Sequence, residues 1–457
     1  MKAVWVVLCQ AGSKFHSGLN WLFPAPASWR STSRITEAIG LLGLFFLFLG
    51  LGPAKSLQNT GMTLMLFSLI LSWKTVLPAL RRDPFALLTL LWIFYLVFNA
   101  ALATWSPYGG GINHFEDVRS LGRIYLVILV AWWLGGSVKG LYSVLLLALT
   151  GLLIAVLQEV ARHGWEFSIL IRGPRLDFVR NAQDFGLFAA AALLGLLLLA
   201  KRIIGPFSQN KILLIVRLTL WIGITLLVSV SFAAAEVRSQ WLALGVVSMM
   251  STLILLGRAI LTTPFQPIRL FAPLAVIVAA GLLLFSQWDR ATERWQREAH
   301  IYPLILKGDL KKIPTTSVGH RIHLWGGALD AIKERPLLGW GPSSAEAVIK
   351  KAKIPKKTKK QFGHFHNSYL DMAVRTGLIG VAFMIGFFFL ILRALWRGHQ
   401  RGHIAGDIAL FYMGTLLVLV IGNATESFVR FQFGWFFMAA VMALIYRHTI
   451  MQGQKTA

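Results

Sequence analysis

Long runs of apolar residues, separated by short polar connections, dominate this chain of 457 residues. Each run approaches the roughly 20 residues that a helix needs to cross a bilayer core. Twelve such runs stand out, at residues 35–52, 61–73, 85–105, 119–136, 141–157, 186–200, 212–235, 241–256, 270–285, 378–392, 408–422 and 433–446. The pattern therefore predicts an all-α polytopic membrane protein with about twelve transmembrane helices.

The positions of Lys and Arg in the short connections predict how the chain crosses the membrane. If the N-terminus is cytoplasmic, every connection on that side is basic and nearly free of acid, as cytoplasmic loops usually are. Examples are Arg81 with Arg82, Lys139, Lys201 with Arg202, and Arg393 with Arg397. Residues 1–34 then form a cytoplasmic N-terminal arm, and residues 449–457 form a cytoplasmic tail.

One long polar segment divides the rest of the chain. Residues 35–286 hold the first nine predicted spans, residues 287–367 form a large loop on the non-cytoplasmic face, and residues 368–448 hold the last three spans. The loop contains 16 Lys and Arg against 7 Asp and Glu. Long translocated segments can escape the charge rule, but we favour a surface that attracts anionic substrates.

The large loop contains helical patterns of its own. Apolar residues at 322, 325, 329 and 332 recur at the spacing of one helix face, and Arg335-Pro336 should end that helix. Ser343 and Glu346 predict a capping box for a second helix. Residues 350–360 hold seven lysines, which fit either a solvated loop or a contact with phosphorylated lipid headgroups.

Composition and missing motifs narrow the function classes. The chain is 56% hydrophobic and 14% charged, whereas a soluble domain is about 25% charged. Its net charge of +26 lies in connections and the large loop, so we expect no nucleic-acid partner, and its single cysteine, Cys9, excludes an intramolecular disulfide. We find no Walker A motif, dinucleotide-binding glycine pattern, nucleophile elbow or Asp-x-Asp metal motif. Carboxylates are nearly absent from the predicted spans, which argues against a proton-coupled transporter.

Candidate chemistry begins with His364-Phe365-His366-Asn367, just before a predicted span. Two histidines at this spacing could ligate a metal, but no third ligand joins them nearby in sequence except Asp371, which is weak alone. We therefore expect no metal site. A histidine at the membrane surface suits general-base work, because imidazole ionises near neutral pH; the plainer alternative is a structural histidine.

Three arginines at predicted membrane boundaries are the second candidate group. Arg180, Arg238 and Arg321 all fall on the non-cytoplasmic face in the predicted topology. Guanidinium groups can hold phosphate oxygens bidentately and stay charged. Each alone is more simply a snorkelling or loop arginine. Together, beside a histidine, they predict a site that stabilises a pyrophosphate leaving group without a divalent cation.

These features together resemble the O-antigen ligase and polymerase superfamily of bacterial envelope enzymes. The resemblance is carried by GHRIHLW at 319–325, RPLLGWGP at 335–342, His366-Asn367, and GLIG at 377–380. It implies a GT-C-like fold with a large periplasmic loop, in the Gram-negative inner membrane. The implied reaction transfers a polysaccharide from undecaprenyl pyrophosphate to the lipid A–core oligosaccharide, with inversion and without a metal or other cofactor.

The resemblance also assigns roles to residues. It places the essential histidine at His366, as base for the acceptor hydroxyl, and the loop-associated arginines at Arg180, Arg238 and Arg321. His364 and Asn367 join the expected pyrophosphate- and substrate-binding set. Two alternative functions that use the same donor stay open, those of an O-antigen polymerase and of a protein O-oligosaccharyltransferase. A transporter of lipid-linked sugars is the alternative from another class, but it would need polar groups through the membrane depth.

Overall fold

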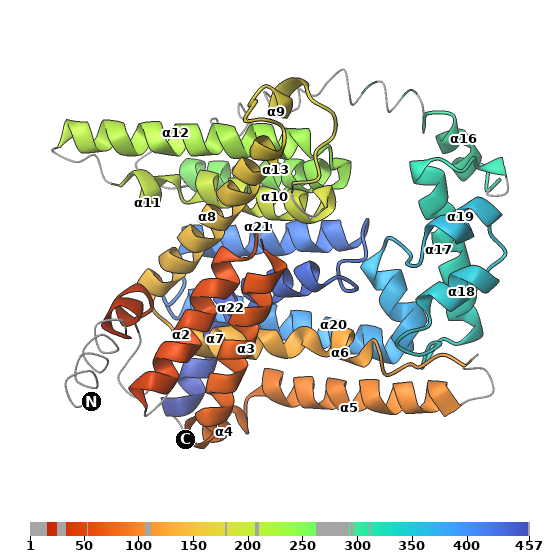
Figure 1. Cartoon of the computed structure of the whole chain (residues 1–457), viewed down its shortest axis with the longest axis horizontal. Coiled ribbons are helices and arrows are strands. Elements are labelled where there is room, and N and C mark those ends of the chain that lie inside the picture. Colours follow the sequence, from red (N-terminus) through yellow and green to blue (C-terminus); the bar gives the residue numbers. More distant parts are fainter. Residues whose placement is uncertain are drawn as a thin grey trace.

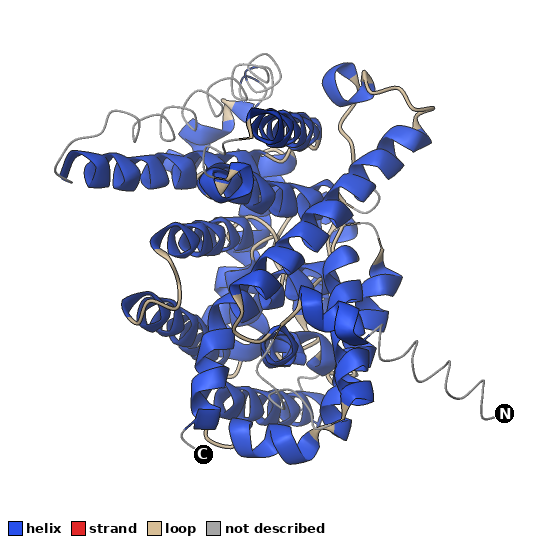
Figure 2. Cartoon of the chain, turned by 90° about the vertical axis from the view of Figure 1, so that its left-hand side faces the viewer, coloured by secondary structure: helices blue, strands red, loops and turns tan. Residues whose placement is uncertain are grey.

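The structure is a computed structural model that describes residues 16–24, 33–52, 54–105, 111–178, 181–205, 210–261, 292, 296, 298–309 and 312–455. Within these ranges every regular element is a helix (Figure 2). The predicted all-α class is confirmed. Most of the predicted N-terminal arm, the predicted span at 270–285 and Arg180 lie outside the described residues.

The helices in chain order are α2 (Arg34–Leu49), α3 (Lys55–Leu71), α4 (Trp73–Leu80), α5 (Pro84–Trp105), α6 (Val118–Leu121), η1 (Gly122–Tyr125), α7 (Leu126–Leu134), α8 (Val138–Arg162), α9 (Ile169–Arg172), α10 (Ala182–Leu198), α11 (Ala200–Ile204), α12 (Lys211–Ala234), α13 (Arg238–Leu261), α16 (Ile301–Leu306), α17 (Ser317–Glu334), α18 (Ala345–Lys351), α19 (Lys356–Gln361), α20 (Ser368–Gln400), α21 (Gly406–Asn423) and α22 (Gln432–Lys455).

Seven of the described helices are long and apolar enough to cross a membrane, namely α5, α8, α12, α13, α20, α21 and α22. Each coincides with a predicted span. The pair α3 and α4, bent by 89°, adds an eighth if it counts as one broken span. The predicted spans at 35–52 and 186–200 fall on α2 and α10, which have 16 and 17 residues. Residues 119–136 are divided among α6, η1 and α7. The chain is therefore a multi-pass helical protein, with fewer full-length spans in its described part than the twelve predicted.

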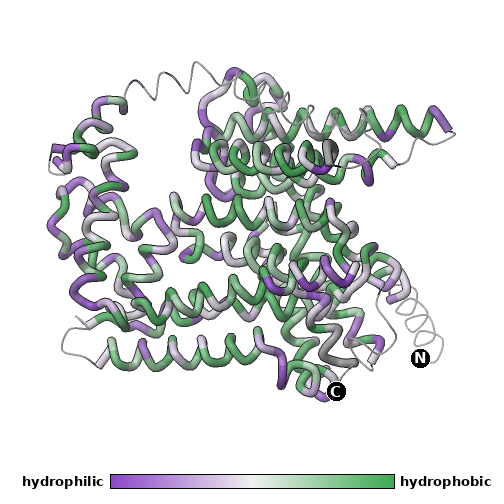
Figure 3. Tube along the Cα trace, turned by 180° about the vertical axis from the view of Figure 1, so that it is seen from behind, coloured by the Kyte–Doolittle hydropathy of each residue, from purple (hydrophilic) through white to green (hydrophobic). Residues whose placement is uncertain are grey.

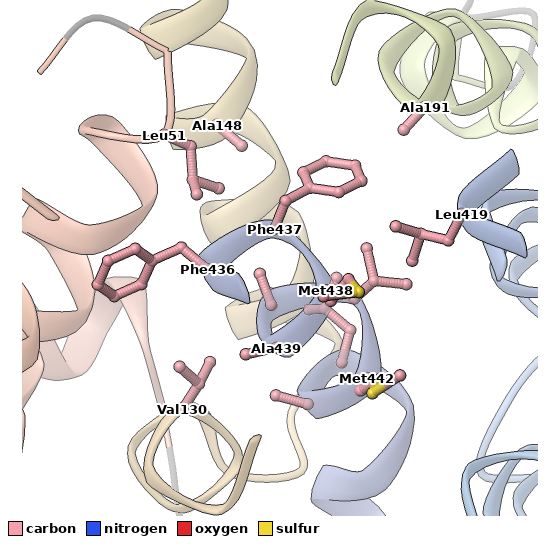
Figure 4. Close-up of a cluster of buried hydrophobic side chains, with 14 of the residues drawn as sticks. Leu51, Val130, Ala148, Ala191, Leu419, Phe436, Phe437, Met438, Ala439 and Met442 are labelled. Atoms are coloured by element: carbon pink, nitrogen blue, oxygen red, sulfur yellow. The ribbon is translucent and has the colours of Figure 1, made fainter. Parts of the chain in front are cut away.

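Helix α22 forms the centre of the bundle. Of its apolar window 89% is buried, compared with 11% for α12, so α22 is enclosed by protein while α12 faces outward. Phe436 and Phe437 leave α22 in different directions and meet side chains from several other helices (Figure 4). Close packing of this kind drives helix association in a bilayer, where no hydrophobic effect operates between helices.

Helices α5, α12, α20 and α21 run in nearly the same direction, α2, α3 and α8 cross them obliquely, and α16–α19 gather at one end of the bundle (Figure 1). Hydropathy follows this division, because the bundle is largely apolar while α16–α19 contain many hydrophilic residues (Figure 3). The C-terminal end of α22 lies at the opposite end of the bundle (Figure 1). Helices α16–α19 with their connections, residues 298–367, are called the loop domain below.

The loop domain confirms one predicted helix and corrects its details. Helix α17 covers the predicted pattern and ends at Glu334, before Pro336. Its buried face, however, is formed by Leu324, Ala328 and Ala331, while Leu329 is 51% exposed. The predicted capping box is wrong, because α18 is capped by residue 344 without a side-chain hydrogen bond. The Ser343 hydroxyl is instead used by the 114–117 segment, where it donates to a carbonyl and accepts an amide N–H.

Two glycines of the RPLLGWGP and GLIG motifs join the loop domain to α20. Gly377 breaks α20 with φ +62°, and Gly339 has φ +70°. A Cβ on Gly377 would lie 2.1 Å from the Leu337 carbonyl oxygen, and one on Gly339 would lie 2.6 Å from the Gly377 nitrogen. Backbone hydrogen bonds join the segments 336–341 and 374–379, including Trp340 N–H to Val374 O at 2.8 Å. These glycines hold the loop domain at the start of a membrane helix.

Replacing Gly377 with alanine is expected to destabilise the fold by about 2–4 kcal/mol, because positive φ and the clash with a carbonyl oxygen each cost energy. The midpoint of thermal unfolding in detergent measures the effect. Gly326→Ala is the matched control, since no atom lies within 4 Å of a Cβ built at Gly326. An unchanged midpoint for Gly377→Ala would contradict the close approach described here.

Candidate active site

His364 and His366 both face one carboxylate. Side chains along this segment alternate in direction. Phe365, between the two histidines, is therefore fully buried in the core of the loop domain. The Trp325 indole N–H fixes the segment by donating to the Phe365 carbonyl at 3.0 Å. On the other side, His364 Nε2 lies 3.1 Å from Glu426 Oε1, and His366 Nδ1 lies 3.0 Å from Glu426 Oε2. The two imidazole centroids are 4.1 Å apart.

Glu426 is a buried acceptor in the turn between α21 and α22. Besides the two histidines, the backbone N–H of Ser427 donates to its Oε1 at 2.9 Å. Burial raises the pKa of the Glu426 carboxyl, but the hydrogen bonds from His364 and His366 outweigh burial and hold its pKa well below the ordinary value. Glu426 therefore stays ionised and can only accept hydrogen bonds.

This carboxylate determines the tautomer of His366. Since Glu426 accepts, Nδ1 of His366 carries the proton, and the lone pair of the neutral ring is on Nε2. Nε2 is buried and has no hydrogen-bond partner among the described residues. The residue has φ +49°, a strained value for a side chain with a Cβ, and Phe362 packs edge-on against the ring at 4.9 Å. An oriented imidazole with an unused basic nitrogen is suited to take a proton from a hydroxyl.

Two of the predicted arginines lie in the same neighbourhood. Arg238, the first residue of α13, donates from Nη1 to Oε2 of buried Glu298 at 3.1 Å. Arg321 lies in the first turns of α17. The charges of two arginines and two carboxylates act on its guanidinium, namely Arg238, Arg175, Glu298 and Glu426. Burial lowers the pKa of the Arg321 guanidinium, and the Glu426 carboxylate opposes this. The fold therefore brings Arg321 near the carboxylate that orients the histidine, and Arg238 near Arg321.

Arg175 is a cation that the sequence reasoning did not single out. It is exposed, while its neighbours Leu176 and Phe178 are buried and anchor the segment. The Leu176 N–H donates to the last carbonyl of α12 at 3.1 Å, and the Phe178 ring stacks on Phe185 at 3.8 Å. Buried apolar residues thus hold an exposed arginine near the site. In the sequence, the alternation of apolar and polar residues over 175–178 could have indicated this anchored segment.

Asn367 starts α20. Its side-chain oxygen accepts the N–H groups of Tyr369 at 3.0 Å and Leu370 at 3.1 Å, which is the bonding of a helix N-cap. Its own N–H donates to the Ser427 hydroxyl at 3.2 Å. Asn367 therefore ties the histidine segment to the turn that carries Glu426. Its predicted contact with substrate stays a prediction.

The fold supplies the third ligand that sequence spacing did not offer. Ligand atoms of His364, His366 and Glu426 lie within 4.8 Å of one another, so these residues could hold a metal ion. Two imidazoles and a carboxylate are a common donor set for zinc. Asp371, the carboxylate considered from the sequence, instead receives a hydrogen bond from Arg375 at 2.7 Å.

Glu426 is the main residue that the sequence reasoning missed. It lies 60 positions after His366, in a turn that the topology already placed on the same face. It is also the one acidic residue after Asp407. A single carboxylate in an apolar stretch beside a predicted catalytic face was a usable signal.

Comparison with known proteins gives a family match over part of the chain. Residues 223–385 match the family described as O-Antigen ligase. The matched segment contains Arg238, Arg321 and His366, and Glu426 lies beyond it. The resemblance to the O-antigen ligase superfamily is thereby confirmed over this segment.

A relative among curated proteins is an uncharacterized protein of Haemophilus influenzae. It is 40% identical over 73 residues, which make up 15% of this chain and 18% of that protein. The chain therefore matches less than a fifth of the length of this relative.

Proposed function

We propose that this protein is an O-antigen ligase. It transfers a polysaccharide from undecaprenyl pyrophosphate to a sugar hydroxyl of lipid A–core, on the periplasmic face of the bacterial inner membrane. The observation that carries the proposal is the buried Nε2 of His366, which has no hydrogen-bond partner in the described part of the chain and is oriented by Glu426 beside Arg321. The proposed topology has about twelve spans in a GT-C-like arrangement, with both termini cytoplasmic.

The proposed reaction is a direct displacement. The acceptor hydroxyl oxygen forms a bond with the anomeric carbon as the bond to the pyrophosphate oxygen breaks. The hydroxyl proton moves to Nε2 of His366, and the ionised Glu426 stabilises the resulting imidazolium, as the carboxylate of a catalytic triad does. The electron pair of the broken bond leaves with undecaprenyl pyrophosphate. Attack opposite the leaving group inverts the anomeric centre.

The arginines stabilise the charge on the leaving group. Pyrophosphate is a dianionic or more highly charged group, and fixed guanidinium groups can hold its oxygens where other enzymes use magnesium. In this proposal Arg321 and Arg238 take that role, with Arg180 as the third predicted member. Arg238 already pairs with Glu298, so phosphate oxygens would compete with that carboxylate for its N–H groups.

Reconstitution with both substrates tests the proposal. Purified protein is mixed with undecaprenyl-pyrophosphate-linked glycan and rough lipopolysaccharide, and the products are separated on a gel. Glycan-capped lipopolysaccharide that depends on His366 supports the ligase. Longer lipid-linked glycan with unmodified lipopolysaccharide indicates a polymerase, and transfer only to an added periplasmic protein indicates an oligosaccharyltransferase. No covalent product would favour a transporter.

Transfer is expected to continue in EDTA at a rate within about twofold of the untreated protein, although three potential metal ligands meet at the site. Both Glu426 oxygens already accept histidine N–H groups, and a metal would displace those protons and occupy the ring nitrogens. The gel assay after EDTA treatment and gel filtration measures this. If activity were lost in EDTA and restored by zinc, the arginine account of the leaving group would be wrong.

A further inference from the structure

A cavity of about 550 Å³ lies in the loop domain, between α17, α18 and the segment around residues 112–114. This volume is in the range of pockets that bind small ligands. Helix α17 lines it with Gly327, Asp330, Ala331 and Glu334, past the turns that hold Arg321. Asp330 lies nine residues after Arg321, roughly 13 Å further along the helix axis. The cavity is therefore separate from the site at His366.

The wall of the cavity includes a buried hydroxyl group that lacks a hydrogen-bond partner. Ser344 is 3% exposed, and its hydroxyl has no hydrogen-bond partner in the part of the chain that the structure describes. Buried hydroxyl groups in proteins nearly always have one. Ser344 lines the cavity, so rotation of its side chain, whose oxygen is now closed off from the cavity, would allow a ligand hydroxyl to supply that partner.

An aromatic ring is held in place at the same cavity. The Trp340 indole N–H donates to the Ala331 carbonyl at 2.9 Å, and the Arg335 guanidinium lies 4.3 Å from the ring centroid. Both contacts fix the indole before any ligand arrives. Preorganised aromatic side chains with a few polar groups are typical of small-molecule sites, and sugars present both apolar faces and hydroxyl groups to such a surface.

Charged side chains complete the lining. On the α17 side, Asp330 and Glu334 offer acceptors for sugar hydroxyls, and Lys333 Nζ lies 4.0 Å from Asp330. On the other side, Lys351 and Lys353 form no ion pair with any described residue. Their neighbour Lys350, by contrast, is bound to Glu346 at 2.7 Å. Two free ammonium groups at a cavity rim are suited to a phosphate.

We infer that this cavity binds a phosphorylated sugar of the acceptor glycan, some sugars away from the hydroxyl that reacts. The inference rests on the proposed function, since it assigns the cavity to that reaction's acceptor. The donor's pyrophosphate must lie at the reacting carbon, beside Arg321, and cannot reach lysines a helix segment away. An acceptor oligosaccharide spans that separation, and remote binding of this kind positions the reacting hydroxyl.

Direct binding without turnover tests the inference. The probe is deacylated, phosphorylated core oligosaccharide from rough lipopolysaccharide, titrated into the detergent-solubilised full chain with no donor present. We expect Lys351→Gln with Lys353→Gln to weaken binding about 10-fold, the scale of losing charge-assisted hydrogen bonds. Lys356→Gln with Lys360→Gln is the matched control, because it removes the same charge from α19, outside the cavity.

Three results separate the outcomes. Probe treated with phosphatase should bind the wild type about as weakly as intact probe binds the cavity variant. Equal weakening by the cavity and control variants would overturn the inference, because general attraction to a basic surface would explain it. Binding that is unaffected by phosphatase would also overturn it. Absence of transfer in the reconstituted system, with this binding pattern intact, would instead reject the proposed reaction alone.

Discussion

Replacing His366 with alanine is expected to lower the transfer rate by about 10²–10⁴-fold, the usual contribution of a general base. The variant loses the nitrogen that accepts the proton of the attacking hydroxyl, while little packing is lost, since the ring is flanked mainly by His364 and Phe362. The rate is measured in the reconstituted gel assay, and folding is checked by the thermal midpoint. We expect the midpoint to change by only a few degrees.

The neighbouring residues separate a base from a structural histidine. Glu426→Gln keeps the shape of the side chain but removes the charge that stabilises the imidazolium. We expect a loss of rate, though a smaller one than in His366→Ala, because a neutral amide no longer stabilises the positively charged ring. Hydrogen bonds hold the pKa of Glu426 below its ordinary value. Loss of wild-type activity through protonation of this carboxyl should therefore appear only at a pH below the ordinary range of a glutamate.

His364→Gln is the closest control, since its ring donates to the same carboxylate through the other oxygen. If His366 acts as the base, His364→Gln keeps much of the activity. Equal loss in both histidine variants would mean that the pair serves to hold the 363–367 segment and that the base lies elsewhere.

The positions of the long helices could be predicted from the sequence more accurately than where each helix breaks or ends. Seven predicted spans coincide with long apolar helices, because apolar content alone defines them. The run at 119–136 is also mostly apolar, yet a 3₁₀ turn at 122–125 divides it, and Gly135 with φ +66° ends α7. Such breaks depend on backbone geometry and neighbours, which a count of apolar residues does not contain.

The site residues and contacts that could not be predicted depend on side-chain partners far apart in the sequence. His366 was predicted because a short local motif carries it, and Arg321 because it lies in another. Glu426 belongs to no such motif and reaches His366 only through the packing of the α21–α22 turn against the start of α20, which Ser368 and Ser427 fasten by hydrogen bonds. The capping box at Ser343 failed for the same reason, since its hydroxyl bonds residues more than 220 positions away.

The glycines and the histidine of these motifs serve different purposes in the structure. The GLIG segment lies close to the histidine motif in sequence, but Gly377 approaches the backbone of residues 337–338. Tyr95 and Asn99 of α5 reinforce this junction by donating to the carbonyls of Thr376 at 2.5 Å and Leu338 at 2.7 Å. The motif therefore joins a residue suited to chemistry with residues that fix the loop domain on the bundle.

The second large effect is expected at Arg321, where replacement by glutamine should lower the turnover number by about 10²–10³-fold, as loss of one charge-stabilising donor does in other enzymes. Burial lowers the pKa of this guanidinium, yet arginine remains charged at neutral pH. In such a setting the charge is less screened by water, so it interacts more strongly with an anionic leaving group than an exposed lysine would.

Kinetic constants distinguish this role from simple attraction of substrate. If Arg321 stabilises the departing pyrophosphate, Arg321→Gln lowers the turnover number and leaves the KM for the donor nearly unchanged. Arg321→Lys should recover only part of the rate, because an ammonium group cannot hold two phosphate oxygens in the planar manner of a guanidinium. Lys307→Gln, which removes an exposed positive charge from the same domain, should change little. A raised KM with an unchanged turnover number in Arg321→Gln would assign the residue to ground-state binding. The leaving group would then need another partner, and Arg238 and Arg175 are two cations whose charges act on Arg321.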